Sequence, residues 1–338
     1  MSNCCKPKAV EIDLVSNVSG AFNLDPDLVN AWGIVVYDGY IYVTAGGSSL
    51  LIRYNECGQC PLKISFYDEG GTLLTDVEPT GLVINPTDGY LIADGLRATR
   101  SALLISSESG DIFGYNRCLG EGNKAYRIYN GSSLPNAPVY KGLAVTNKLL
   151  FAVDFLNAFI DVFKDVGNVN SINLISRIQR YSLVGPNFAS PFNIVHIDNV
   201  LFVLYANKAS ASDTDDLGGG FIDIHNESGV FIRTFNNTDS SLDSPWGLVK
   251  APRSLGCNGG DILVGNFKSG IINVYNKCGA RIGELQNGIT NVPVYINGLW
   301  GLYVKCDRLY FAAGPLDEAN GLVGYLERDC CRYRHECC

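Results

Sequence analysis

A short hydrophobic segment centred on glycine recurs six times along the chain, and this recurrence constrains the fold more than any single residue does. The segments read AWGIVV, PTGLVI, YKGLAV, SPFNIV, SPWGLV and GLWGLYV, and they align on Gly33, Gly81, Gly142, Asn193, Gly247 and Gly301. Successive aligned residues are 48, 61, 51, 54 and 54 positions apart. A repeat of about 50 residues is typical of propellers, in which each four-stranded unit buries its faces against its neighbours.

Within one repeat the sequence predicts four strands. After Trp32 the chain reads IVVYDG, YIYVTAGG, LLIRYN and LKISFYD, and the fifth repeat follows the same order with WGLVKAP, DILVGNF, GIINVYN and ARIGELQ. These runs are rich in β-branched and aromatic residues and are separated by turns that contain Gly, Asn or Asp. No long segment has the apolar period of a helix. The prediction is an all-β, six-bladed β-propeller.

The sixth repeat has only three strands of its own before the cysteine-rich tail begins at Cys330. Residues 10–16 (VEIDLVS) precede the first repeat and have no partner there. We expect this segment to pair as the outer strand of the last blade, which closes the ring and leaves no open seam. The expected organisation is an N-terminal arm over residues 1–9, one propeller domain over residues 10–329 and a cysteine-rich tail over residues 330–338.

Composition limits the partners. The net charge of −8 disfavours binding to a phosphate backbone, so we expect no nucleic-acid partner. No apolar run is long enough for a membrane-spanning helix. Residues 1–8 lack the apolar region of a secretory signal.

The twelve cysteines are the second informative feature. In an antiparallel blade, the turn after the first strand and the turn after the third strand lie on the same face, and the predicted cysteine positions fall in such turns or beside the paired chain ends. We therefore expect all of them on one face of the propeller. They are Cys4, Cys5, Cys57, Cys60, Cys118, Cys257, Cys278, Cys306, Cys330, Cys331, Cys337 and Cys338.

Three chemistries compete for these thiols. Zinc is favoured by the Cys57-Gly-Gln-Cys60 spacing, but a second such pair is missing, and the sequence places no histidine beside this one. A redox dithiol is disfavoured because CGQC lies on a hairpin and not before a helix. Disulfides are the favoured interpretation, since the number of cysteines is even and the doublets at both chain ends exceed what closing one ring requires. Some of these bonds are expected to link subunits.

Asn-X-Ser/Thr triplets support an extracellular or particle-surface location, because attached glycans there would be solvated. The four candidate glycosylation sites, each in or beside a predicted turn, are Asn17, Asn130, Asn226 and Asn236.

An enzymatic alternative rests on oxygen-bearing side chains expected on the face opposite the cysteines. Asp154, Asn207 and Asn266 occupy equivalent loops, and the insert SASDTDDLGGG adds Asp213, Asp215 and Asp216. Such groups are calcium ligands, so calcium is the one cofactor that the sequence leaves open, although a solvated acidic loop explains the insert more simply. No G-x-S-x-G motif is present and no histidine pairs with a nucleophile, so no catalytic residue is assigned.

Tryptophan recurs at one position of the repeat, as Trp32, Trp246 and Trp300. This repetition favours packing between blades near the axis over an exposed sugar-binding rim. A glycan-binding alternative would require other exposed aromatic residues such as Tyr37, Tyr40 or Tyr90.

Several motifs also carry a resemblance to a known family. They are LDPDLVNAWGI, PVYKGLAV, SPWGLV, ILVGNFKSGIINVYN, NGLWGLYV and LYFAAGPLDEANGLVGYL, spread over residues 24–326. The chain resembles an uncharacterised bacterial family of propellers that is related to NHL repeats and associated with PEP-CTERM exported proteins. The resemblance implies a six-bladed fold and no activity, and the family lacks the terminal cysteine doublets found here.

Together these features favour a structural or adhesive propeller that forms an extracellular, disulfide-reinforced homo-oligomer or filament. Its expected partner is a second copy of the chain, with glycans as a further candidate. The alternative functions are a calcium-dependent lactonase-like or esterase-like enzyme and a glycan-binding module.

Overall fold

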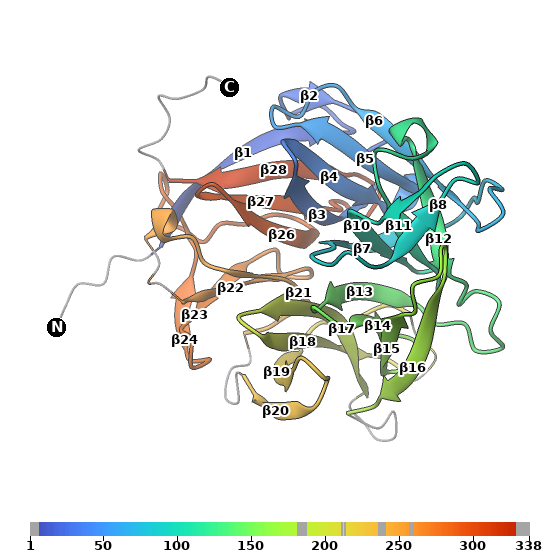
Figure 1. The fold of residues 1–338 in the computed structure, drawn as a ribbon. Helices are drawn as coiled ribbons and strands as arrows, with labels where there is room; N and C mark the ends of the chain where they lie inside the picture. The colour runs from blue at the N-terminus through green and yellow to red at the C-terminus, as the bar shows by residue number, and fades with distance from the viewer. Residues whose placement is uncertain are drawn as a thin grey trace.

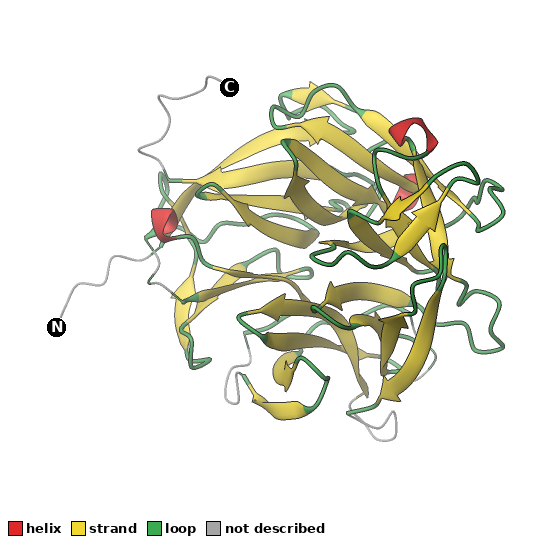
Figure 2. Cartoon of the chain, viewed as in Figure 1, coloured by secondary structure: helices red, strands yellow, loops and turns green. Residues whose placement is uncertain are grey.

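Six four-stranded units surround one centre, and each contributes one innermost strand (Figure 1). The computed structural model describes residues 7–180, 188–210, 212, 214–235, 241–256, 258 and 260–328. Strands dominate these residues, and the helical segments among them are three short 3-10 turns, η1 (Gly46–Ser48), η2 (Gly120–Gly122) and η3 (Arg253–Leu255) (Figure 2). The predicted six-bladed β-propeller is confirmed.

The strands follow the repeat in chain order, from the innermost to the outermost of each blade. Blade 1 contains β3 (Ala31–Tyr37), β4 (Tyr40–Ala45), β5 (Leu50–Asn55) and β6 (Leu62–Tyr67). Blade 2 contains β7 (Pro79–Ile84), β10 (Leu103–Ser107), β11 (Ile112–Tyr115) and β12 (Lys124–Tyr129). Blade 3 contains β13 (Tyr140–Val145), β14 (Leu150–Asp154), β15 (Phe159–Asp165) and β16 (Ile172–Ile178).

Blades 4 to 6 repeat this order. Blade 4 contains β17 (Phe188–Ile197), β18 (Val200–Lys208), β19 (Phe221–Asn226) and β20 (Phe231–Thr234). Blade 5 contains β21 (Pro245–Lys250), β22 (Ile262–Asn266), β23 (Ile272–Tyr275) and β24 (Arg281–Glu284). Blade 6 contains β26 (Leu299–Lys305), β27 (Arg308–Ala313), β28 (Leu322–Glu327) and β1 (Lys8–Ser16). The innermost strands contact one another in sequence around the ring, and β26 contacts β3.

The N-terminal strand closes the last blade, as the sequence predicts. Strand β1 runs antiparallel to β28, with Val10 opposite Glu327 and Ser16 opposite Leu322. Two short strands, β2 (Asn23–Leu24) and β25 (Gln286–Asn287), pair parallel with β1 and cover its outer edge. The first and last strands are therefore held together by backbone hydrogen bonds, so neither blade 1 nor blade 6 ends the ring with an unpaired seam.

Blade 2 departs from the simple repeat. A hairpin of β8 (Leu91–Ala93) and β9 (Ala98–Arg100) is inserted between its first two strands, within the longest of the five repeat spacings. Its outer strand β12 also pairs parallel with β6, which joins blades 1 and 2 into one continuous sheet.

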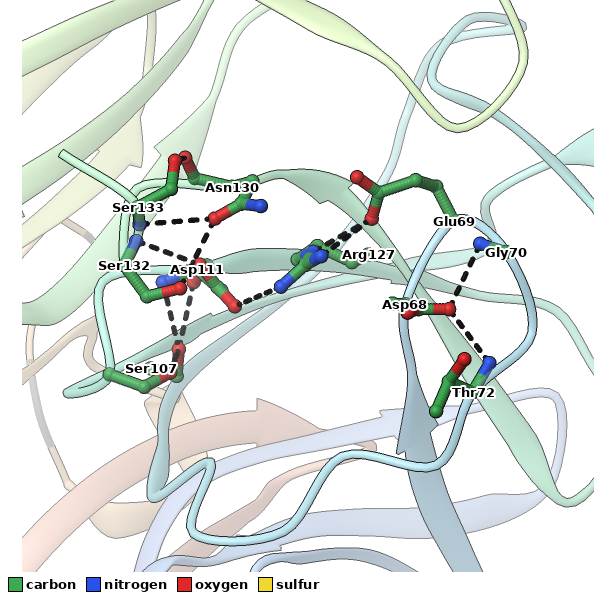
Figure 3. Close-up of polar contacts among 11 residues, drawn as sticks. Asp68, Glu69, Gly70, Thr72, Ser107, Asp111, Arg127, Asn130, Ser132 and Ser133 are labelled. Atoms are coloured by element: carbon green, nitrogen blue, oxygen red, sulfur yellow. Dashed lines mark hydrogen bonds and ion pairs between the residues drawn. The ribbon is translucent and has the colours of Figure 1, made fainter.

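Side chains reinforce this junction, as Figure 3 shows. The guanidinium of Arg127 lies between two carboxylates, 2.8 Å from Glu69 and 3.1 Å from Asp111. These contacts raise the pKa of Arg127 against the lowering effect of its burial. Because Glu69 belongs to blade 1 and Asp111 to blade 2, the arginine ties the two blades together near their outer edges.

Candidate functional site

The aligned glycines lie where the inner strands of neighbouring blades meet around the axis. A Cβ atom added at Gly301 would lie 2.4 Å from the carbonyl oxygen of Trp32, and one at Gly33 would lie 2.7 Å from that of Thr80. Only glycine fits where backbones meet at this distance. At the one exception, Asn193, the side-chain Nδ2 donates a hydrogen bond to the carbonyl oxygen of Trp246 at 2.7 Å.

On one side of this ring the centre is closed by an aromatic floor, which we define as Trp32, Phe155, Phe192, Trp246, Phe267 and Trp300. The Trp300 ring stacks on Trp32 with centroids 3.5 Å apart and on Phe267 at 3.9 Å, while Trp246 meets it edge-on at 5.9 Å. The prediction that the tryptophans pack near the axis is confirmed. Interlocked rings of this size leave the floor densely packed.

On the other side of the ring the centre is hollow. A cavity of about 900 Å³ is bounded by the innermost strands, with Trp246 at its inner end. Its wall is mostly Leu, Ile and Val, and several of these side chains, such as Val83, Val249 and Val304, are only half-buried. The cavity opens beside the turns that follow the first strands, where Pro252 and Arg253 contribute to its lining.

The titratable side chains with a basic group that line the cavity are His196, Lys250 and Arg253, and no Asp or Glu among the described residues lines it. His196 Nε2 lies 2.9 Å from Glu227, and Lys250 Nζ lies 2.6 Å from Asp198. Arg253 is exposed and makes no ion pair with any residue in the described part of the chain. Among the described residues, the cavity lining therefore contains basic side chains and no carboxylate, in a protein whose net charge is −8.

The candidate calcium ligands Asp154 and Asn266 lie on the opposite face, where each forms hydrogen bonds with residues of the adjoining loops. The Asp154 carboxylate accepts hydrogen bonds from the backbone N–H of Val139 and Asn157 and from the Asn157 amide, and burial raises its pKa. Asn266 accepts a hydrogen bond from the backbone of Asp243 and donates one to Ile271. Asp154 is the last residue of β14 and Asn266 the last residue of β22, so both side chains hold the loop that follows the second strand of their blade.

The acidic insert gives no further support for a metal centre. Asp216 is buried and accepts hydrogen bonds from Ser244 and from the backbone of Gly218, while Asp215 is exposed. Asn207 is half-buried beside Gly219. Asp213 lies outside the described residues. Within the described ranges, no group of three or more His, Cys, Asp or Glu residues is arranged to hold a metal ion.

The described cysteines lie in turns on the face where the cavity opens. Cys57 and Cys60 follow β5, Cys118 follows β11, Cys278 follows β23 and Cys306 follows β26. Four of them, Cys60, Cys118, Cys278 and Cys306, have free and exposed thiols. Cys57 is disulfide-bonded, and none of these four is its partner. Cys4, Cys5, Cys257, Cys330, Cys331, Cys337 and Cys338 lie outside the described residues, so pairing of these cysteines stays a prediction.

The candidate glycosylation sites differ in their surroundings. Asn226 is exposed, whereas Asn17 and Asn130 are half-buried. The Asn130 Oδ1 accepts hydrogen bonds from Ser132 and Ser133 (Figure 3). Asn236 lies outside the described residues.

Of the tyrosines named for glycan binding, Tyr90 is buried, so the expectation of an exposed ring is wrong there. Its ring packs in a core cluster with Ile92 and Leu104. Tyr37 and Tyr40 are half-buried, and the Arg53 guanidinium lies over the Tyr40 ring.

Comparison with known sequences reveals relatives in a giant virus. The chain is 31% identical over 323 residues to "Uncharacterized protein L690" of Acanthamoeba polyphaga mimivirus, covering 91% of this chain and 83% of L690. The chain belongs to the L690 family. A further mimivirus relative, "Uncharacterized protein R648", is 29% identical over 335 residues, covering 94% of this chain and 79% of R648. The resemblance to a bacterial PEP-CTERM-associated family is therefore wrong, because these relatives are mimivirus proteins. No family model matches the sequence.

Solved structures similar to this member of the L690 family confirm the fold. A streptogramin B lyase superposes with a TM-score of 0.54 at 12% identity, covering 97% of this chain and 99% of the lyase. A luciferin-regenerating enzyme superposes with a TM-score of 0.56 at 10% identity, covering 95% and 96% of the two chains. At such low identity the likeness extends to the propeller alone. In the part of the chain that the structure describes, no helix is long and apolar enough to cross a membrane.

Proposed function

We propose that this propeller is a binding module that holds a small, mainly apolar molecule in its central cavity. The observation that supports this function is the cavity itself, about 900 Å³ with apolar walls and one closed end. Cavities that enclose small molecules measure roughly 300 to 1,000 Å³ and are lined mostly by hydrophobic side chains.

Burial of apolar surface supplies the driving force for such binding. The half-buried valines of the wall, Val83, Val249 and Val304, border the hollow and retain contact with solvent. An apolar ligand that covers them removes both its own surface and theirs from water, at roughly 25 cal/mol for each Å². Since the walls belong to six strands fixed by the ring, little conformational entropy is lost when the ligand enters.

A fluorescent apolar probe tests this function. Titration with N-phenylnaphthylamine is expected to give saturable binding to the native protein, with enhanced emission because the probe moves from water to an apolar surrounding. Val249→Trp fills the hollow and is expected to weaken binding at least about tenfold, the equivalent of 1.4 kcal/mol. The matched control is Val230→Trp, because Val230 is 61% exposed in a turn of blade 4 and does not line the cavity.

Two results would exclude cavity binding: no saturable signal with the native protein, or equal affinity in the two tryptophan variants. Far-ultraviolet circular dichroism of each variant establishes that the propeller has folded. Wild-type affinity in a folded Val249→Trp protein would therefore place the probe elsewhere.

A second candidate function is covalent assembly through the cysteine face, and the four exposed free thiols on that face favour it. Two thiols on neighbouring copies would lose two protons and two electrons to an oxidant such as molecular oxygen and form one S–S bond. The product is a disulfide-linked homo-oligomer or filament. Such bonds persist outside a reducing cytoplasm, for example on a particle surface. Glycosylation at Asn226, which is exposed, fits the same setting.

Electrophoresis of protein extracted with thiols blocked tests covalent assembly. A ladder of multimers is expected without reductant and a single monomer band with it. Replacing Cys60, Cys118, Cys278 and Cys306 together by serine is expected to shorten the ladder. A monomer band under both conditions would eliminate covalent assembly and leave the cavity-binding function untouched.

A further inference from the structure

The charge at the cavity mouth narrows the class of ligand. Every charged residue that lines the cavity is basic, although acidic residues outnumber basic ones in the whole chain, 34 to 26. The carboxylates of Glu227 and Asp198, which pair with His196 and Lys250, are not part of the lining. Within the part of the lining that the structure describes, a ligand therefore meets basic side chains at the mouth and no carboxylate.

Arg253 is the basic residue best placed to recognise a ligand. It begins the short turn η3 directly after Pro252, and both residues line the cavity. Pro252 adopts φ −72°, the angle that its ring imposes, so the backbone leading to Arg253 is restricted. While His196 and Lys250 have carboxylate partners, Arg253 is exposed and has no such partner among the described residues.

Resting on the proposed function, we infer that the ligand is an anionic amphiphile whose apolar body fills the cavity and whose acidic headgroup pairs with Arg253. The guanidinium presents parallel N–H donors that match the two oxygens of a carboxylate or phosphate. Among the described residues that line the cavity, the basic side chains lie at the mouth, so the headgroup lies there and the apolar body lies against the leucine, isoleucine and valine walls.

Neutral and cationic ligands fit this distribution less well. A neutral amphiphile would gain the apolar contacts and leave the arginine with water alone. A cationic headgroup would be repelled by Arg253, and no carboxylate among the described lining residues would offset that repulsion. The structure thus orders the three headgroup classes as anionic, neutral and cationic, from tightest to weakest binding.

Displacement of N-phenylnaphthylamine by three ligands with the same alkyl chain tests this order. Decanoate is expected to bind about three- to tenfold more tightly than decanol, and decyltrimethylammonium more weakly than either, at low salt. Decyl phosphate distinguishes the two headgroup chemistries. Tighter binding of decyl phosphate than of decanoate would indicate that the natural headgroup is a phosphate, and tighter binding of decanoate would indicate a carboxylate. The advantage of decanoate over decanol is expected to shrink as salt is added.

Arg253→Gln is expected to remove most of that advantage, because it lowers the affinity for decanoate more than the affinity for decanol. The matched control is Arg97→Gln, which deletes the same charge from the exposed β8–β9 hairpin, away from the cavity. Equal binding of decanoate and decanol to the native protein would overturn the headgroup assignment while the cavity function stands. Retention of the decanoate preference in Arg253→Gln would overturn the role of Arg253. Failure of the neutral probe and of all the ligands to bind would instead overturn the proposed function.

Discussion

The two ends of the central axis are built from the same six strands and differ in packing and in charge. At the closed end, the aromatic floor fills the space, and Glu108 and Glu318 lie near Lys141 above it. At the open end, smaller aliphatic residues leave a hollow of about 900 Å³, and the lining charges are all basic. This difference in packing and charge arises within a few residues of each inner strand. The residues before the aligned position lie at the closed end, and the residues after it lie at the open end.

This contrast shows how one repeat supports both stability and binding. The residue before the aligned position is Trp, Phe, Lys or Thr, and the side chains there converge and interlock. The residues after it are mostly Val, Ile, Leu and Ala, which are too small to meet across the axis. Packing is thus concentrated at one end, so the other end can remain hollow without opening the ring.

The largest expected effect comes from breaking the closed end. Trp300→Ala removes a ring that is 1% exposed and stacked between Trp32 and Phe267. The free energy of unfolding is expected to fall by about 3 to 5 kcal/mol, because such a deletion loses apolar burial and leaves a cavity in the floor. The change is measured by urea denaturation, with unfolding monitored by far-ultraviolet circular dichroism and not by tryptophan fluorescence.

Phe22→Ala is the control, since Phe22 is 73% exposed and its loss is expected to change the free energy of unfolding by less than about 0.5 kcal/mol. If Trp300→Ala cost no more than Phe22→Ala, the floor would not be the stabilising end and the comparison between the two ends would fail.

A smaller effect is expected at the ring that separates the ends. Gly301→Ala places a methyl group 2.4 Å from the Trp32 carbonyl oxygen, and because that atom belongs to the backbone it cannot move aside easily. Overpacking of this kind costs about 1 to 3 kcal/mol. Thermal denaturation is the measurement, and Gly46→Ala is the matched control, because the nearest atoms to an added methyl there lie at an ordinary 3.5 Å. Equal melting temperatures for the two variants would show that the inner ring tolerates side chains.

The repeat predicted the fold because each step of the propeller depends on a local pattern. The spacing of Gly33, Gly81 and the other aligned residues fixed the number of blades, and the unpartnered segment 10–16 fixed the closure. The recurrence of Trp32, Trp246 and Trp300 likewise predicted that these rings pack near the axis. The β8–β9 insertion was not predicted, because the long second spacing indicates extra residues and not their structure.

The open end could not be predicted in the same way. The cavity exists because the side chains of the six inner strands do not reach one another across the axis. The sequence of one repeat does not contain the width of the ring, so it cannot show whether residues of the size of valine fill the centre. Arg253 stood out in no motif, since its importance comes from lying at the mouth while other cations are paired. Conversely, Asp154 and Asn266 seemed to be ligands because they recur at one loop position, and that recurrence reflects loop hydrogen bonds.

The smallest expected effect is a pH dependence confined to the closed end. Burial raises the pKa of Glu318 above its usual value of 4.5, and the nearby Glu108 acts in the same direction, while Lys141 and a hydrogen bond from Asn30 oppose it. Between 4.5 and the raised value, the folded protein binds more protons at this group than the unfolded chain does, so stability falls as pH rises through that interval. Glu318→Gln is expected to flatten this part of a melting-temperature profile measured from pH 4 to 8 and to be more stable than the native protein above it. The control is Glu121→Gln, on an exposed turn of blade 2, which should leave the profile unchanged. A profile for Glu318→Gln that follows the native one would show that the carboxylate is fully hydrated when folded, and the closed end would then differ from the open one in packing alone.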